Sequence, residues 1–205
     1  MITESTRMKL SVADGTEMGA YVSRPRDAGR HPGIIVFQEA LGVNPQIRGV
    51  ADRYAALGFV AVAPDLFHRV RRGYEANAIV MEELMPLVNC MGGRAVYIAN
   101  SELPLAAAIS YYAGAVAPSL LDRAGSMHGP HLFFWGGRDK GIPPEQHRAV
   151  ADAYRAAGKD FVDVEFSDCD HAFFNEQADR YSHAAAKQSW AMGLAFLADA
   201  LALEE

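Results

Sequence analysis

The first part of the chain alternates apolar and polar residues with a period of two. Alternating apolar positions lie on both sides of the turn signal Asp14-Gly15, at Met8, Leu10 and Val12 and then at Met18, Ala20 and Val22. Successive side chains of a strand point to opposite faces, so this pattern is typical of strands with one buried face. It predicts a hairpin over residues 8–22.

Short continuous apolar runs follow the hairpin. Residues 34–37 and 59–64 have almost no polar side chains, which predicts strands of a parallel sheet covered on both faces. Residues 106–111 and 132–135 are two further strand candidates. Residues 161–166 alternate again and predict the last strand.

Helical signals lie between these strands. Asn44-Pro45 predicts the N-cap and first residue of a helix that ends at Gly58. Further helices are predicted over residues 144–157 and 183–203. Alternation of strands and helices predicts an α/β fold with a mostly parallel central sheet flanked by helices, and no linker divides residues 1–205, so we expect a single domain.

The composition and charge of the chain restrict the kinds of partner that it can bind. The 205 residues carry a formal net charge of −6, which argues against nucleic acid as a partner. The polar N-terminus lacks the apolar core of a signal peptide. The uncharged stretch Leu103–Leu121 contains prolines and many alanines, so a buried strand is favoured over a membrane span.

Two cysteines, Cys90 and Cys169, are too few for a disulfide framework. Reduced thiols indicate a cytoplasmic protein, and we expect a monomer or a homodimer without a cofactor.

Residues with reactive side chains follow several of the predicted strands, where open α/β sheets bind their ligands. Cys90 precedes Met91-Gly92-Gly93 and a helical pattern, as expected for a nucleophile on a tight turn before a helix. The backbone amide of Met91 is then placed to donate to an oxyanion. Cys90, Asp139 and His171 occur in the chain order of an α/β-hydrolase triad.

Several longer stretches resemble the dienelactone hydrolase family, whose members include carboxymethylenebutenolidase-like proteins. The matching stretches are residues 36–44, 63–67, 90–94, 110–114, 136–139 and 171–175. The resemblance extends over nearly the whole chain and implies an α/β-hydrolase fold.

The resemblance also implies roles. Cys90 would be the nucleophile, His171 its general base and Asp139 the carboxylate that orients the imidazole, while Glu39 would contact the resting thiol. A thiolate is the species that is oxidised, so the contact with Glu39, called the mask below, would limit oxidation of Cys90 by keeping its thiol protonated.

Further roles concern the substrate. The backbone amides of Met91 and Ala40 would form the oxyanion hole. Arg69 matches an arginine that binds the substrate carboxylate, although a surface charge is an equal alternative. Tyr111 and Phe173 are candidates for an apolar substrate pocket.

Two departures from the family affect substrate choice. Asn175 stands where dienelactone hydrolases have a second carboxylate-binding arginine, and Ala172 replaces the serine that follows the histidine. The sequence therefore indicates a relative with a different or broader substrate range.

A third departure lies before the nucleophile. Val88 stands where the family has glycine, and residues 75–88 predict a helix rather than a strand. The stretch from Arg69 to Cys90 is short by about a helix and a strand, relative to the family pattern. Either the turn is remodelled by a deletion or, as we favour, the natural protein has further residues between Asn89 and Cys90.

Three functions fit these residues. The main prediction is a thiol hydrolase that cleaves a small ester or lactone through an acyl-enzyme. The first alternative is an inactive binding protein or redox sensor on the same scaffold. A metal site at Cys90, His171 and nearby acids is disfavoured, because no short Cys/His spacing is present. Cys169 is interpreted as a spare thiol.

Overall fold

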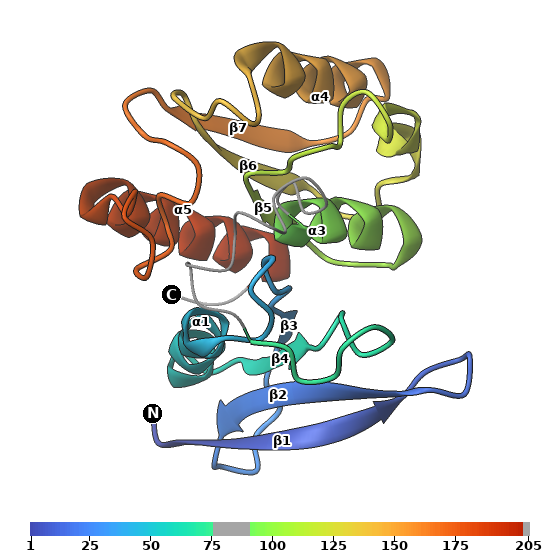
Figure 1. Cartoon of the computed structure of the whole chain (residues 1–205), viewed down its shortest axis with the longest axis vertical. Helices are drawn as coiled ribbons and strands as arrows, with labels where there is room; N and C mark the ends of the chain where they lie inside the picture. Colours follow the sequence, from blue (N-terminus) through green and yellow to red (C-terminus); the bar gives the residue numbers. More distant parts are fainter. Residues whose placement is uncertain (76–90, 203–205) are drawn as a thin grey trace. The chain divides into compact units, whose positions relative to one another are not determined.

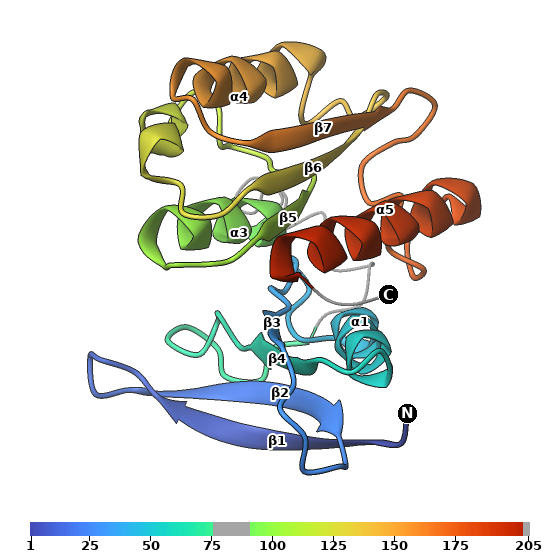
Figure 2. The same ribbon diagram turned by 180° about the vertical axis from the view of Figure 1, so that it is seen from behind.

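The computed structural model describes residues 1–75 and 91–202, which fall into two compact units, Met1–Pro86 and Leu87–Glu205 (Figures 1 and 2). The described part of the first unit has a sheet and helix α1 (Pro45–Ala56), and that of the second has a sheet and several helices. The predicted helix over residues 75–88 lies almost wholly outside the described residues, as does the junction of Asn89 and Cys90. The expectation of a single domain stays a prediction.

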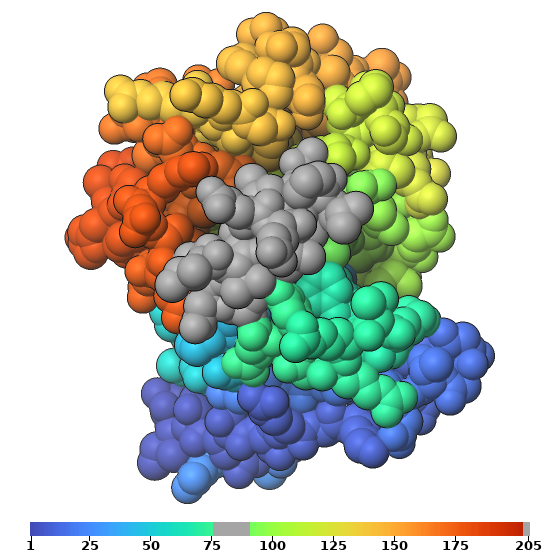
Figure 3. Space-filling model, in the orientation of Figure 1, coloured from blue at the N-terminus to red at the C-terminus, as the bar shows by residue number. Residues whose placement is uncertain are grey.

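The first unit begins with a long hairpin. Strands β1 (Thr3–Ser11) and β2 (Glu17–Pro25) pair antiparallel. The turn is closed by a 3.0 Å bond from Val12 N to Thr16 O, and Gly15 has a φ of 82°, which a glycine adopts readily. The predicted hairpin is confirmed, and its two strands extend beyond the alternating residues 8–22 at both ends. Most side chains of β1 are exposed, and the hairpin is the blue surface in Figure 3.

Strands β3 (Gly33–Ile35) and β4 (Val60–Pro64) complete the sheet of the first unit, in the order β1-β2-β4-β3. β3 and β4 are parallel, as predicted. The expected burial of residues 34–37 on both faces is wrong for Ile35, whose exposed fraction is 44%. Among the strands of residues 1–75, β3 is the last in the order of this sheet.

Helix α1 (Pro45–Ala56) has the predicted ends. The side-chain oxygen of Asn44 accepts a 3.1 Å bond from Ile47 N, which satisfies one amide of the first turn. Gly58 follows the helix with a φ of 97°. The helix packs on β2, where the hydroxyl of Tyr21 donates to Asp52 at 2.8 Å.

The second unit contains a parallel three-stranded sheet in the order β5-β6-β7. Its elements are β5 (Ala108–Tyr111), β6 (His131–Gly136), β7 (Phe161–Phe166), α3 (Met91–Glu102), the short 3-10 helix η2 (Leu121–Ser126), α4 (Pro144–Ala156) and α5 (His183–Leu201). Strands β5, β6 and β7 and helices α4 and α5 lie within a few residues of the predicted ranges, whereas no range was predicted for α3 or η2. The α/β prediction with parallel strands is thereby confirmed in this unit.

Strand β6 lies at the centre of this sheet and is buried along its whole length. Phe133 stacks between His131 and Trp135 on one face, which α3 and α4 cover through Tyr97 and Tyr154. On the opposite face, the ring of Phe134 contacts the rings of Tyr111 from β5 and Phe166 from β7. On the Tyr111 face, α5 reaches β5, where Gly193 lies against Ile109. Alternate residues of β6 therefore belong to two layers of the core.

The uncharged stretch Leu103–Leu121 contains strand β5, as expected. Among residues 1–75 and 91–202, no helix is both long and apolar enough to cross a bilayer.

Candidate active site

Asp139 and His171 form a hydrogen-bonded pair at the carboxyl ends of β6 and β7. Asp139 lies three residues after β6, and His171 lies five residues after β7. The distance from His171 Nδ1 to Asp139 Oδ2 is 2.6 Å, and the Asp139 side chain is only 3% exposed, against 30% for His171. A buried carboxylate at Nδ1 fixes the tautomer and the orientation of the ring.

The other oxygen of Asp139 is held by backbone amides of its own loop. Gly141 N donates to Oδ1 at 2.8 Å, and Ile142 N donates to the same atom at 3.2 Å. Burial tends to raise the pKa of Asp139, but the hydrogen bond and charge of His171 and these two amides outweigh it, so the pKa lies below its ordinary value. Asp139 is thus an oriented, ionised carboxylate at neutral pH.

Tyr112 supports the histidine loop, and the sequence did not single it out. Its ring centroid lies 4.9 Å from that of His171, and its hydroxyl accepts a 2.6 Å bond from Phe174 N. Its φ of 49° lies in the left-handed region, which is uncommon for a bulky residue. The two adjacent tyrosines at the end of β5 were visible in the sequence, but its alternation does not show that Tyr112, the first residue after the strand, has the left-handed conformation.

The first turn of α3 packs directly on the end of β5. A Cβ atom at Gly93 would overlap the carbonyl oxygen of Tyr111 and lie 3.0 Å from Ala113. The hydroxyl of Ser110 donates to Gly93 O at 2.9 Å. Met91 is the first residue of α3, so its predicted oxyanion-hole amide lies at a helix N-terminus, where amides have no partner within the helix. Cys90 lies outside the described residues.

Glu39 and Ala40 lie in a turn of the first unit. Glu39 forms a bridge with Gly42, whose amide donates to Glu39 O at 3.2 Å. Gly42 has a φ of 79°, and a side chain there would strike the carbonyl of Tyr74. Ala40 is buried. The glycine makes this turn possible, whereas the roles of Glu39 as a mask and Ala40 as an oxyanion donor stay predictions.

Arg69 is engaged with an acid of the first unit. Its Nε donates to Asp14 Oδ2 at 2.7 Å, and its side chain is 54% exposed. Because this ion pair joins the loop after β4 to the hairpin turn, it favours the surface-charge alternative that the sequence left open for Arg69.

Tyr111 and Phe173 differ in accessibility. Tyr111 is partly buried, and its ring lies 4.6 Å from that of Phe174 and 4.8 Å from that of Phe134. Phe173 is fully buried against Phe166 and Tyr112. Tyr111 stays a candidate for substrate contact, whereas Phe173 is a core residue without support for that role.

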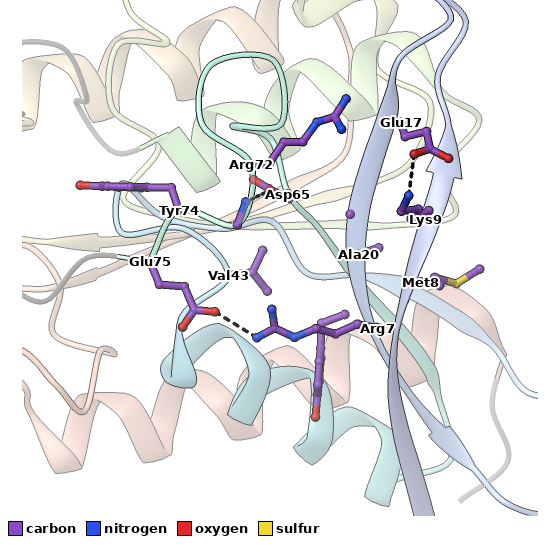
Figure 4. Close-up of a pocket in the computed structure, with 13 residues that line it drawn as sticks. Arg7, Met8, Lys9, Glu17, Ala20, Val43, Asp65, Arg72, Tyr74 and Glu75 are labelled. Carbon is purple, nitrogen blue, oxygen red and sulfur yellow. Dashed lines mark hydrogen bonds and ion pairs between the residues drawn. The ribbon is translucent and has the colours of Figure 1, made fainter.

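A cavity of about 180 Å³ opens in the first unit (Figure 4). Arg7, Lys9, Glu17 and Glu75 line it, and they pair as Arg7 with Glu75 at 3.1 Å and Lys9 with Glu17 at 2.8 Å. None of the predicted site residues lines this cavity. Its charges compensate one another, so we assign it no part in the chemistry.

Cys169 precedes His171 by two residues and is a buried free thiol. Burial raises its pKa, which the neighbouring Asp168 also raises, so the group stays protonated at neutral pH. The described parts of the chain contain no group of three or more His, Cys, Asp or Glu side chains placed to hold a metal ion.

The chain that carries Asp139 and His171 is similar to known proteins over most of its length. The sequence profile of the dienelactone hydrolase family matches residues 18–89 and 80–201. This chain belongs to the dienelactone hydrolase family. It is accordingly a carboxylic ester hydrolase with an α/β-hydrolase fold.

Relatives in sequence and structure agree with this assignment. A Salmonella typhimurium protein named "Putative carboxymethylenebutenolidase" is 29% identical over 219 residues, covering 87% of this chain and 81% of its own length. A Klebsiella pneumoniae structure titled "Putative Dienelactone Hydrolase" has a TM-score of 0.82 and 28% identity, with 95% of this chain and 99% of that chain covered. A metagenomic dienelactone hydrolase-like phosphotriesterase shares the fold, with a TM-score of 0.81, 22% identity, and 95% and 98% coverage.

Proposed function

We propose that this protein hydrolyses a small carboxylic ester or lactone through an acyl-enzyme on Cys90, with His171 as general base and Asp139 as the orienting carboxylate. The observation that carries the proposal is the 2.6 Å contact between His171 Nδ1 and Asp139 Oδ2 at the carboxyl ends of two parallel strands. Since Nδ1–H is committed to the carboxylate, Nε2 is the nitrogen that exchanges a proton with a nucleophile.

The reaction proceeds in two halves. In the first, the thiol proton of Cys90 passes to His171 Nε2, and the thiolate sulfur bonds to the carbonyl carbon of the substrate. The tetrahedral intermediate collapses, the carbon–oxygen bond to the leaving group breaks, and the leaving oxygen takes the proton from His171. In the second half, His171 removes a proton from water, whose oxygen bonds to the thioester carbonyl carbon. The carbon–sulfur bond then breaks, the acid is released, and the Cys90 sulfur takes the proton back from His171.

Backbone amides stabilise the charge that develops on the carbonyl oxygen. Met91 N, at the start of α3, and Ala40 N, in the turn after β3, are the proposed donors. Glu39 is proposed to accept a hydrogen bond from the resting thiol and to release it when substrate binds. That mask protects a reactive sulfur from oxidation.

The substrate is a small molecule. The substrate range of this protein differs from that of a dienelactone hydrolase that binds the substrate carboxylate with two arginines. Asn175 replaces one of these arginines, and Arg69 is paired with Asp14. The aromatic rings of Tyr111 and Phe174, 4.6 Å apart near the histidine loop, favour an apolar acyl or alcohol group. We infer no cofactor, a monomer or homodimer, and a reducing compartment such as the cytoplasm, where Cys90 stays a thiol.

Ester hydrolysis by three forms of the protein tests the proposal. The wild type should hydrolyse p-nitrophenyl acetate and a dienelactone, Cys90→Ala should lose this activity, and Cys169→Ala should retain it as the matched thiol control. Mass spectrometry of a rapidly quenched reaction should detect one acyl group on Cys90.

Other outcomes would favour the alternatives. Undiminished turnover by Cys90→Ala would overturn the nucleophile assignment, and loss of turnover with a chelator would favour metal chemistry. A wild type that is inactive on both esters, yet forms a reversible oxidised species at Cys90, would favour the redox sensor.

A further inference from the structure

His147 lies in the first turns of α4, close to the loop that carries Asp139, and the proposed mechanism does not use it. Its side chain is almost fully buried, with a relative exposure of 4% for the residue. The ring stacks on Trp135 of β6, with centroids 4.4 Å apart and an interplanar angle of 13°. A buried imidazole in a fixed orientation makes specific hydrogen bonds, and these identify its role.

One ring nitrogen of His147 binds the loop backbone. The distance from Nε2 to Ile142 O is 2.8 Å. A carbonyl oxygen only accepts hydrogen bonds, so Nε2 carries the proton and donates it. The other nitrogen, Nδ1, has no hydrogen bond, and Glu165 Oε2 lies 3.6 Å from it, beyond hydrogen-bonding distance.

Ile142, which accepts the hydrogen bond of His147, also donates a hydrogen bond to the carboxylate of Asp139. Ile142 N donates to Asp139 Oδ1 at 3.2 Å, while its own carbonyl accepts from His147. Asp139 Oδ2 in turn accepts from His171 Nδ1 at 2.6 Å. A continuous series of contacts therefore runs from α4 through Ile142 to Asp139 and His171, entirely within the second unit.

We propose that His147 is a positioning residue of the triad, which fixes the loop from Asp139 to Ile142 through its hydrogen bond to the Ile142 carbonyl. The proposal rests on the proposed function, because it assigns His147 an effect on the same Asp139–His171 pair. Ile142 is 3% exposed, so its carbonyl has little access to water if the imidazole donor is removed. The loop then relaxes, and the carboxylate leaves the geometry that orients His171.

Three variants separate positioning from general destabilisation. His147→Phe keeps a ring to stack on Trp135 but has no N–H, whereas His147→Gln keeps an N–H donor that can reach Ile142 O. Val150→Ala removes buried volume from the same helix without touching this series of contacts. Urea unfolding of each variant records the loss of stability independently of the site.

The first readout needs no turnover. The Nδ1 proton of His171, held in a 2.6 Å bond to a carboxylate, should give a far-downfield proton resonance in the wild type. We expect this resonance to be lost or to move upfield in His147→Phe and to persist in His147→Gln and Val150→Ala. An unchanged resonance in His147→Phe, or its equal loss in Val150→Ala, would overturn the positioning role.

The second readout is ester hydrolysis. We expect kcat to fall by about 10- to 100-fold in His147→Phe with KM nearly unchanged, since misplacement by a fraction of an ångström affects the reaction more than binding. His147→Gln should recover most of this loss. Equal loss in both variants would count against the hydrogen bond. An inactive wild type would instead refute the proposed function and leave the resonance to decide the role of His147.

Discussion

The imidazole of His131 and the hydroxyl of Ser110 are joined by a 2.8 Å hydrogen bond between β6 and β5, and both side chains are completely buried. Ser110 donates its own proton to Gly93 O, so it accepts from Nε2–H of His131. The hydroxyl of Tyr154 lies 2.8 Å from Nδ1 and donates to it. The neutral imidazole thus links α4 to the first turn of α3, the helix that follows Cys90.

This network predicts a loss of stability in acid. Burial lowers the pKa of His131 to about 3, whereas an unfolded histidine titrates near 6.5. Between these values the unfolded chain binds a proton that the folded chain does not, so the free energy of unfolding falls as the pH decreases. The contribution is complete above about pH 6.5 and has a slope of at most ~1.4 kcal/mol per pH unit.

Urea unfolding at several values between about pH 7 and pH 4 measures this slope. His131→Gln keeps a donor and an acceptor but does not titrate, so it should be less stable at neutral pH and show a shallower pH dependence than the wild type. An equal slope in the two proteins would mean that other groups cause the acid sensitivity.

Asp139→Asn should abolish most of the activity while leaving the fold intact. The two amides of Gly141 and Ile142 require an oxygen, so the Asn side chain should turn its NH₂ group toward His171. His171 Nδ1 must then accept, and the proton moves to Nε2, which can no longer take one from a thiol. By analogy with other triads we expect kcat to fall by up to roughly 10⁴-fold.

Steady-state kinetics and urea unfolding of Asp139→Asn check this expectation together. The free energy of unfolding should change by much less than the loss of kcat implies, because both amides keep a partner. A variant with nearly full activity would show that the carboxylate does not orient the base.

The sequence predicted those parts of the fold and of the site that depend on the residue pattern of a short segment. Strand β7 has the predicted bounds, and the predicted bounds of α4 differ by one residue, because alternation and proline or glycine end signals act locally. Asp139 and His171 could be paired in advance because both follow parallel strands, whose carboxyl ends lie at one edge of a sheet.

Other features depend on contacts that no local pattern contains. His147 and Tyr112 make hydrogen bonds to backbone atoms outside their own elements, Ile142 O and Phe174 N, and a backbone partner leaves no mark in the sequence. The exposure of Ile35 depends on what covers its face of β3, and an apolar run cannot specify what packs on each face.

The family pattern predicts additional residues between Asn89 and Cys90 in the natural protein. The family profile matches this chain in two stretches that overlap at residues 80–89, not in one continuous stretch. The alignment with the Salmonella relative spans 219 residues, more than the 205 of the chain. Relatives therefore contain residues that have no counterpart here.

Tryptic peptide mapping of the protein from its natural source tests this hypothesis. No lysine or arginine occurs between Arg72 and Arg94, so residues 73–94 form one tryptic peptide if Asn89 and Cys90 are directly joined. We expect this peptide to be absent and its two halves to occur in longer fragments. A fragment with the mass of residues 73–94 would show that the short junction is real.

The close approach of α3 to β5 makes Gly93 intolerant of any side chain. A Cβ atom there meets backbone atoms of Tyr111 and Ala113, which cannot rotate away, so α3 must shift. We expect Gly93→Ala to lower the free energy of unfolding by about 1–3 kcal/mol, the usual cost of overpacking. A shift of α3 also moves the Met91 amide, so ester hydrolysis should fall by more than the folded fraction does.

Gly49→Ala is the matched control, because Gly49 lies inside α1 and a Cβ atom there meets nothing within 4 Å. That substitution should raise the free energy of unfolding by about 0.5–1 kcal/mol through helix propensity alone. Urea unfolding and ester hydrolysis of both variants decide the matter. If Gly93→Ala were as stable and active as Gly49→Ala, the first turn of α3 could not be packed on the backbone of β5, and the oxyanion role proposed for Met91 would lose its structural basis.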